Sequence, residues 1–182
     1  MSASTTPSQF KVFKLKFTLS MADPDMPQPR YHHIIFVESN PHDGSGFKFH
    51  VTGDVTSAKG MQYQSIAYHD PKSSKTLFAS EQLGWTDAAN FKSRFDAVLK
   101  NCPPPPQQKD FNTKTMKTEP FKTKSPLTFY GPNEARKPLK KCTEWTEQQA
   151  IPALRAAGLI SAKKAGTPSP PGSRAGSKVS KK

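Results

Sequence analysis

The sequence contains few of the residues that crosslink a chain or anchor it in a membrane. It has only two cysteines, Cys102 and Cys142, so we expect no disulfide framework, and a four-thiolate zinc site is excluded. No window approaches the roughly 20 consecutive apolar residues that span a bilayer. The polar start, Met1 to Gln9, lacks the apolar core of a signal peptide. These absences predict an intracellular protein, cytoplasmic or nuclear, without a transmembrane segment.

Acidic residues are also scarce. The chain has 14 Asp and Glu against 27 Lys and Arg, which gives a formal net charge of +13 at pH 7. Six of the positive charges lie in residues 161–182, a segment that contains no aromatic or acidic residue. Such a segment cannot bury enough apolar surface to offset its conformational entropy, so we expect a disordered basic tail there. The tail is suited to weak contact with nucleic acid or anionic surfaces, although solvated lysines are the simpler interpretation.

The first half of the chain shows the alternation and the turns of an antiparallel sheet. Prolines and aspartates between residues 20 and 30 predict a loop. The turn at 40–46 returns the chain, so the strands on either side of it are expected to form a hairpin. The expected strands are 10–19, 31–38, 47–52, 60–69 and a short one at 75–80.

The later part of the chain changes to helical spacing. Apolar residues recur with this spacing within 86–101, and the proline run after Cys102 ends the helix that they predict. Residues 103–140 are polar, basic and interrupted by prolines, so we expect a long irregular connection.

A second helix is expected to start near Cys142. Thr146 and Gln149 have the spacing of a capping box, and Gly158 can end the helix. Pro152 fits only in a first helical turn or at a bend.

Together these segments predict an α+β fold in which an antiparallel sheet packs against two or more helices. A single domain is expected at residues 10–160, after a flexible N-terminus at 1–9 and before the tail at 161–182.

Cys142 is the candidate nucleophile. A cysteine at a helix start lies near unpaired backbone N–H groups and the positive end of the helix dipole, and both stabilise the thiolate. Lys140 and Lys141 add positive charge, which Glu144 partly opposes. The alternative is a small buried thiol, the commoner state of an isolated cysteine. Cys102, which precedes the proline run, is expected to have only that structural role.

Three histidines lie on the expected strands. His32 and His33 are adjacent on one strand, so their side chains point to opposite sides and only one of them can serve as the base. His50, on the neighbouring strand, could hold the second ring nitrogen of that base and fix its tautomer. The three could instead bind zinc, but no helical His-x-x-x-His spacing and no acidic third ligand stand out. No metal and no cofactor are therefore expected.

These residues resemble those of the lecithin retinol acyltransferase-like group, which includes the H-Ras-like suppressor phospholipases and acyltransferases. In that group a His-Trp pair opens a hydrophobic strand, a second His lies on the next strand, and a Cys begins a later helix. The matching positions are His32, followed by His33 in place of Trp, then His50, and Cys142 with Trp145 three residues on. The resemblance implies a circularly permuted papain-like fold with Cys142 as nucleophile, His32 as base and His50 as orienting group.

The sequence is also similar to a group of small fungal proteins, through the runs Tyr-His-His-Ile-Ile-Phe-Val-Glu, His-Val-Thr-Gly-Asp and Cys-Thr-Glu-Trp-Thr. This second resemblance implies no activity. Lys141 stands where the acyltransferase-like group commonly has an asparagine before its cysteine. The departures at Lys141 and His33 argue against a lipid substrate more than against the fold.

The sequence therefore predicts a cysteine-dependent acyltransferase or hydrolase that acts on an amide, ester or isopeptide carbonyl. Cys142, His32 and His50 form the expected site, with His33 as the alternative base. The competing hypotheses are a noncatalytic basic binding module and an auxiliary protein of a fungal pathway. The acyl or peptide substrate is not identified, because residues that line pockets on loops leave no recognisable pattern.

Overall fold

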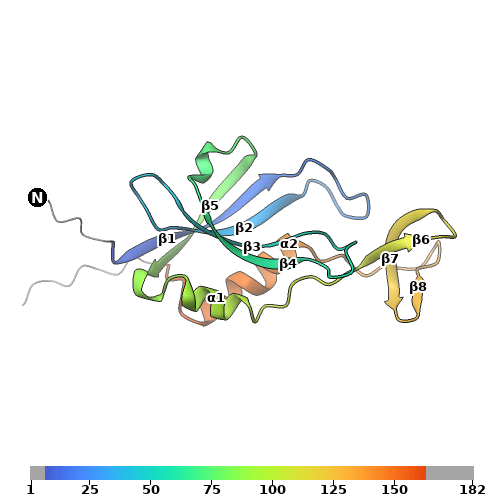
Figure 1. Cartoon of the computed structure of the whole chain (residues 1–182). Coiled ribbons are helices and arrows are strands. Elements are labelled where there is room, and N and C mark those ends of the chain that lie inside the picture. Colours follow the sequence, from blue (N-terminus) through green and yellow to red (C-terminus); the bar gives the residue numbers. More distant parts are fainter. Residues whose placement is uncertain (1–6, 163–182) are drawn as a thin grey trace, which may run out of the picture.

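The computed structural model describes residues 7–162, and its main element is a five-stranded antiparallel sheet with the order β4-β3-β2-β1-β5 (Figure 1). The expected hairpin is confirmed, because β2 and β3 pair across the turn. The α+β fold class, with an antiparallel sheet packed against helices, is confirmed as well. The strands are β1 (Gln9–Thr18), β2 (Tyr31–Glu38), β3 (Gly46–Thr52), β4 (Gln62–Tyr68) and β5 (Leu77–Asp87).

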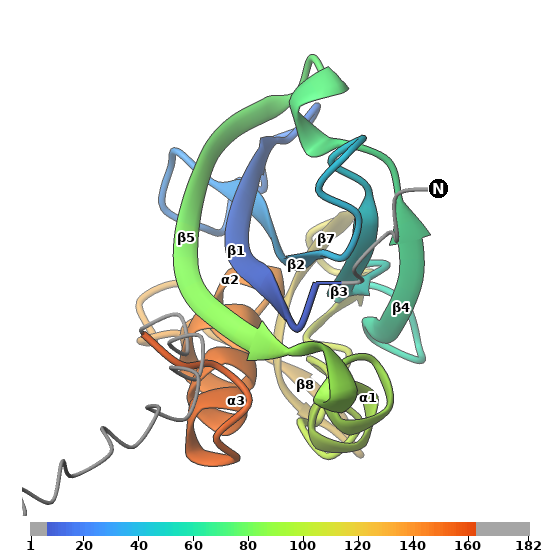
Figure 2. The same cartoon turned by 90° about the vertical axis from the view of Figure 1, so that its left-hand side faces the viewer.

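The large sheet curls and buries apolar residues on both faces. Figure 2 shows α1 and α3 on one side of it. On that face Val12 and Ile35 belong to the larger core cluster, which also contains residues of the helices, whereas Leu15 and Ile34 form a smaller cluster on the other face. Because successive strand residues alternate between faces, burial on both sides explains the unbroken apolar run of β2.

β5 is longer than the expected strand at 75–80, and the helix expected within 86–101 is shorter. Asp87 ends β5, where its carboxylate accepts a hydrogen bond from Ala89 N–H and caps the short helix η2 (Ala88–Asn90). The α-helix α1 (Ser93–Leu99) starts only after η2. Trp85 exchanges two backbone hydrogen bonds with Ser161, at 2.8 and 2.9 Å, which holds the end of β5 extended. A pairing so distant in sequence leaves no local signal.

Two residues expected in the flexible ends belong to the folded part. Gln9 begins β1, and Ser161 forms the bridge with Trp85. The expectations for residues 1–6 and for the tail at 163–182 lie outside the described residues.

Residues 103–140 are not the irregular connection that the sequence predicted. They contain a second antiparallel sheet, β6-β7-β8, which extends away from the large sheet in Figure 1. No strand was predicted here because lysines and threonines occupy both faces, so apolar and polar residues do not alternate. The strands are β6 (Lys109–Asn112), β7 (Lys117–Lys124) and β8 (Leu127–Phe129).

The helix that begins at Cys142 is continuous but not uniform. α2 (Cys142–Trp145) leads into the π-helix η3 (Thr146–Ala150), and α3 (Ile151–Ala156) follows. Pro152 lies in the first turn of α3, directly after the π-helix. Its ring and missing N–H do not fit an uninterrupted α-helix, and the wider π turn accommodates both.

The two ends of this helix differ in how well they were predicted. The capping box expected at Thr146 and Gln149 is wrong, because Thr146 lies inside the helix. Instead, the Glu144 carboxylate accepts a hydrogen bond from Lys141 N–H at 2.8 Å, directly before α2. Gly158 ends the helix as expected, with a φ of +69°.

Candidate active site

Two of the predicted site histidines are joined by a hydrogen bond between neighbouring strands. His32 Nε2 on β2 lies 3.0 Å from His50 Nδ1 on β3, and His50 Nε2 lies 3.1 Å from Gln64 Oε1 on β4. The amide oxygen of Gln64 can only accept, so His50 donates from Nε2 and accepts at Nδ1. His32 must then donate from Nε2, which leaves the lone pair of its Nδ1 free to act as a base.

β2 and β3 separate beside these histidines. Their pairing ends at Ile35 and Phe49, while α2 contacts both strands. Cys142 Sγ lies 3.7 Å from the carbonyl oxygen of Tyr31, and Thr143 Oγ1 lies 3.5 Å from the same oxygen. The start of the helix therefore contacts the stretch of β2 that β3 leaves unpaired.

The Cys142 thiol is buried, with 7% of the residue exposed. Burial raises the pKa of this thiol, and the backbone N–H of His33 and the charge of Arg30 oppose the shift without cancelling it. The thiol is therefore protonated at neutral pH. The helix start and the nearby lysines were expected to stabilise the thiolate, but desolvation outweighs them and the pKa of the thiol is raised.

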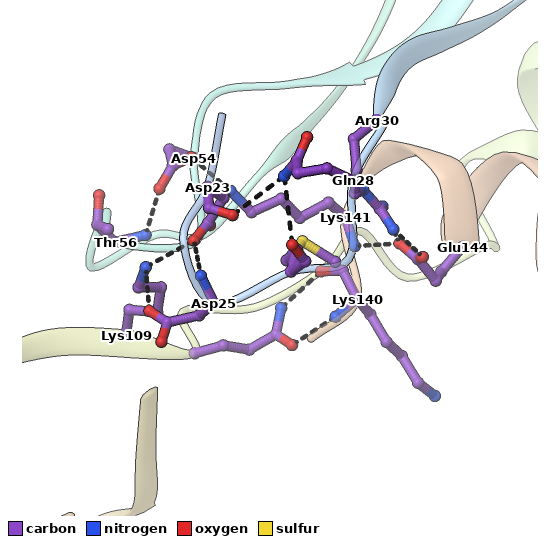
Figure 3. A network of polar contacts seen from close by, with 12 residues as sticks. Asp23, Asp25, Gln28, Arg30, Asp54, Thr56, Lys109, Lys140, Lys141 and Glu144 are labelled. Atoms are coloured by element: carbon purple, nitrogen blue, oxygen red, sulfur yellow. Dashed lines mark hydrogen bonds and ion pairs between the residues drawn. The ribbon is translucent and has the colours of Figure 1, made fainter. Parts of the chain in front are cut away.

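The lysines before Cys142 do not act on its thiol. The Lys141 ammonium lies 2.7 Å from Asp23 Oδ2 and 3.2 Å from Asp54 Oδ2. Figure 3 shows the Lys140 side chain extending away from this network. Lys141 is therefore neutralised by the two carboxylates, and Lys140 points away from the network. Neither ammonium group stabilises a thiolate at Cys142.

His33 lies on the opposite face of β2 from His32. Its Nδ1 is 3.4 Å from Glu147 Oε1 on η3, an ion-pair distance without the geometry of a hydrogen bond. Burial lowers the pKa of His33 to about 4, although Glu147 opposes this, so the imidazole is neutral at pH 7. The pair is therefore not a salt bridge at neutral pH.

The structure brings His32 and His50 into contact and places Cys142 against the backbone on both sides of His32. The carbonyl of Tyr31 precedes His32, and the N–H of His33 follows it. Within residues 7–162 no imidazole nitrogen forms a hydrogen bond with Cys142 Sγ. The thiol belongs to the core cluster on the helix-covered face, whereas the two joined rings project from the other face.

Arg30 and Glu144 fix the start of α2 against the start of β2. Their side chains form two hydrogen bonds of 2.8 Å each, in the bidentate geometry that makes such pairs strong (Figure 3). Arg30 directly precedes β2 and Glu144 is two residues after Cys142, so the pair holds the thiol next to the strand that carries His32.

Cys102 is buried away from these groups. Its carbonyl oxygen accepts a hydrogen bond from Trp145 Nε1 at 3.1 Å, and burial raises the pKa of its thiol. This contact anchors the fully buried Trp145, so Cys102 contributes to packing through its backbone.

No group of three or more His, Cys, Asp or Glu residues that could hold a metal ion occurs within the described range. In the same part of the chain, no helix combines the length and the apolar character needed to cross a membrane.

A model described as a family of unknown function, DUF6540, matches residues 19–161. The chain belongs to the DUF6540 family. No curated protein and no solved structure matches the sequence. In this DUF6540 chain, the matched range includes Cys142, the three strand histidines and their polar partners.

Sequence reasoning missed the polar partners of the site. Gln64 stands opposite His50 in the register of β3 and β4, a relation visible only once the register is known. Glu147 follows Cys142 by five residues, and the intervening π-helix changes the face on which it lies. Arg30 borders a proline-rich loop, and nothing local to the sequence links it to Glu144.

Proposed function

We propose that this protein is a cysteine-dependent acyltransferase or hydrolase acting on an amide, ester or isopeptide carbonyl. The observation that carries the proposal is the hydrogen-bonded chain from Gln64 through His50 to His32, which leaves Nδ1 of His32 free as a base. Cys142 contacts the backbone on both sides of His32 at the edge of β2 that β3 leaves unpaired, so the thiol and the His32 ring, which lie on opposite faces of the strand, can meet only across this open edge. His33 is the alternative base, because it shares its face of β2 with Ile35 and Val37 of the core cluster that contains Cys142.

In the first half of the reaction, His32 Nδ1 reaches the thiol across the unpaired edge of β2 and takes its proton as Cys142 Sγ attacks the carbonyl carbon. Backbone N–H groups at the start of the helix stabilise the oxyanion that forms. His50 accepts the hydrogen bond of His32 Nε2–H and stabilises the imidazolium. The intermediate then expels the amine or alcohol, which takes the proton from His32, and a thioester remains on Cys142.

In the second half, water or an acyl acceptor gives a proton to His32 Nδ1 and attacks the thioester carbonyl. The tetrahedral intermediate expels the Cys142 thiolate, which recovers the proton from His32. Water as the attacking group gives hydrolysis, and an alcohol or amine gives acyl transfer. The cycle consumes no cofactor.

Both reacting groups start neutral. Burial raises the pKa of the Cys142 thiol and lowers the pKa of the His32 imidazole. The proton therefore moves during the attack instead of residing on a preformed imidazolium. Because only neutral imidazole accepts a proton, the lowered pKa keeps His32 competent as a base at mildly acidic pH.

Cys142→Ser tests the nucleophile. The hydroxyl is nearly isosteric with the thiol, so the fold is retained, whereas formation of an acyl-enzyme with an activated ester is lost. Intact-mass spectrometry measures the adduct. Cys102→Ser is the matched control, because it changes the other buried thiol and retains the adduct. An equal adduct on Cys142→Ser, or no thiol-dependent turnover on a broad ester and peptide panel, contradicts the proposal.

Substitution of each histidine tests the assignment of the base. His32→Ala lowers kcat/KM by about 10²–10⁴-fold, the usual contribution of a general base. His50→Ala has a smaller effect because it removes only the orienting group. A larger loss for His33→Ala than for His32→Ala assigns the base to His33 and gives Glu147 the orienting role.

A noncatalytic binding module is the second candidate function. The raised pKa of Cys142 favours it, because a buried, protonated thiol is also what a packing cysteine provides. Reactivity of Cys142 with iodoacetamide across pH separates the two candidates. Labelling that increases as His32 is deprotonated supports catalysis, and labelling that increases only above the unperturbed thiol pKa of about 8.5 supports the binding module.

A further inference from the structure

A cavity of about 620 Å³ lies at the small sheet, away from the histidines of the proposed active site. Its walls are mainly apolar and include the proline run at 103–106, Phe121, Tyr130 and Leu139, while Gln149 of η3 supplies a polar part. Its volume falls within the range of about 300–1,000 Å³ that is typical of small-molecule sites. Size and lining therefore suit a ligand with an apolar body.

The cavity lies in the most basic part of the described chain. Residues 109–141 contain nine Lys and Arg against three Asp and Glu, whereas residues 7–108 contain eleven against nine. Most of the excess positive charge of the folded part is therefore concentrated in the segment that forms the small sheet and one wall of the cavity. A ligand of negative charge is favoured there.

Three lysines line the cavity, and two of them have no acidic partner. Lys122 pairs with Glu134, but in the described residues no carboxylate lies within ion-pair distance of Lys137 or Lys140. In Figure 3 the end of the Lys140 side chain carries no polar contact. Two ammonium groups are therefore available to a ligand.

Hydrogen bonds of the main chain hold these lysines in place. Lys140 N–H donates to Gln108 Oε1 at 2.8 Å, and Gln108 Nε2 donates to Lys140 O at 2.7 Å. Lys137 N–H donates to the Tyr130 hydroxyl at 3.3 Å. Because the backbone is fixed before any ligand arrives, binding orders little more than the two side chains.

We propose that this cavity binds a small organic anion with an apolar ring or chain. The apolar body contacts the prolines and aromatic rings, and its carboxylate, sulfonate or phosphate pairs with Lys137 and Lys140. The basic segment at 161–182 of this chain is an unsuitable occupant, because six positive charges without an acidic residue repel these lysines. The inference does not depend on the proposed catalytic function.

A pair of fluorescent dyes tests both features of the site. The probes are 8-anilinonaphthalene-1-sulfonate and its uncharged parent N-phenyl-1-naphthylamine, titrated into the full chain. We expect one equivalent of each to bind. Lys137→Gln with Lys140→Gln weakens the sulfonate by about tenfold and leaves the uncharged dye unchanged. Gln149→Phe fills the cavity from the helix and abolishes binding of both.

Two matched variants separate this site from general effects of charge and surface. Lys114→Gln with Lys117→Gln removes the same charge from the small sheet outside the cavity, and Gln148→Phe adds the same ring at an exposed helix position. Both keep the affinity of the parent, and all variants keep its thermal midpoint. The proposal is overturned if neither dye binds, if Gln149→Phe binds as the parent does, or if the two lysine pairs have equal effects. Displacement of the sulfonate by heparin at constant ionic strength, which indicates a polyanion surface instead, also overturns it.

Discussion

At the scale of single residues, burial and hydrogen bonding require the same protonation state of the strand histidines. Burial lowers the pKa of His32. Burial, together with repulsion from a protonated His32 and from Lys48, lowers the pKa of His50 to about 4. An imidazole that donates at one nitrogen and accepts at the other must be neutral, and the chain from His32 to Gln64 demands this of His50. The hydrogen-bonded chain is therefore stable at neutral pH and is broken by protonation.

The free energy of unfolding should consequently fall in mild acid. His33 and His50 have pKa values of about 4 in the folded protein, against 6.5 in an unfolded chain, so the unfolded state binds more protons between these values. Stability is fully present above pH 6.5 and is lost as the pH falls toward 4, by about 1.4 kcal/mol per pH unit for each histidine. Denaturant titrations from pH 7 to pH 4.5 measure the slope.

His33→Gln provides the control for this pH dependence. It removes one titrating group and reduces the slope, while the remaining loss belongs to His50 and His32. A stability that does not change between pH 7 and pH 4.5 contradicts the pKa shifts and the neutral hydrogen-bonded chain built on them.

At the scale of secondary-structure elements, the sequence predicted the strands whose apolar side chains are buried and missed those without a regular apolar face. β1 to β4 were located because apolar residues alternate along them or fill them, as a sheet with buried faces requires. β6 to β8 were missed because lysines and threonines lie on both faces of their sheet, so no alternation of apolar and polar residues marks the strands. The end of β5 was missed because Ser161 pairs with Trp85 from far along the chain.

The candidate site was also predictable only in part. Contact between His32 and His50 follows from two neighbouring strands and shared faces, which the sequence pattern supplies. The burial of the Cys142 thiol does not follow from the sequence. Placement at a helix start predicts a lowered pKa for its thiol. The packing of α2 against β2 buries the thiol, and this burial raises its pKa instead.

The turn before β4 packs closely against the proline run at 103–106, and this contact can be tested at Gly60. Gly60 has a φ of +66°, and a Cβ there would lie 2.5 Å from Pro105 O and 2.6 Å from the carbonyl carbon of Pro106. Main-chain atoms cannot rotate out of the way, so Gly60→Ala combines a left-handed backbone with a steric clash. We expect a loss of about 3 kcal/mol in the free energy of unfolding, measured in urea.

Gly53→Ala is the matched variant for Gly60→Ala. Gly53 also has a positive φ, +90°, but the nearest atom to its Cβ would be 3.6 Å away. Only the backbone conformation is penalised, so a loss of about 1 kcal/mol is expected. Equal losses in the two variants mean that the proline run moves away from Gly60 without cost.

At the scale of the whole molecule, an ionic network connects the small sheet with the loop before β2 and the start of the helix (Figure 3). Lys109 Nζ lies 2.9 Å from Asp23 Oδ1 and 2.7 Å from Asp25 Oδ2, and Lys141 also pairs with Asp23. Burial alone would raise the pKa of Asp23, but its hydrogen bonds with Lys141 and Lys109 outweigh burial and lower it to about 2. The Asp23 carboxylate is therefore charged throughout the neutral range.

Removal of Lys109 should weaken this connection strongly. Its side chain is 7% exposed, so Lys109→Met leaves Asp23 and Asp25 partly buried without their shared cation. Asp23 keeps Lys141 and Asp25 keeps Arg136 as partners, so we expect a loss of about 1.5–3 kcal/mol in the free energy of unfolding, the usual contribution of hydrogen bonds to charged groups, measured in urea. Lys117→Met, on the exposed surface of β7, should change it by no more than about 0.5 kcal/mol. If both variants match the parent, apolar contacts hold the small sheet in place and the network does not.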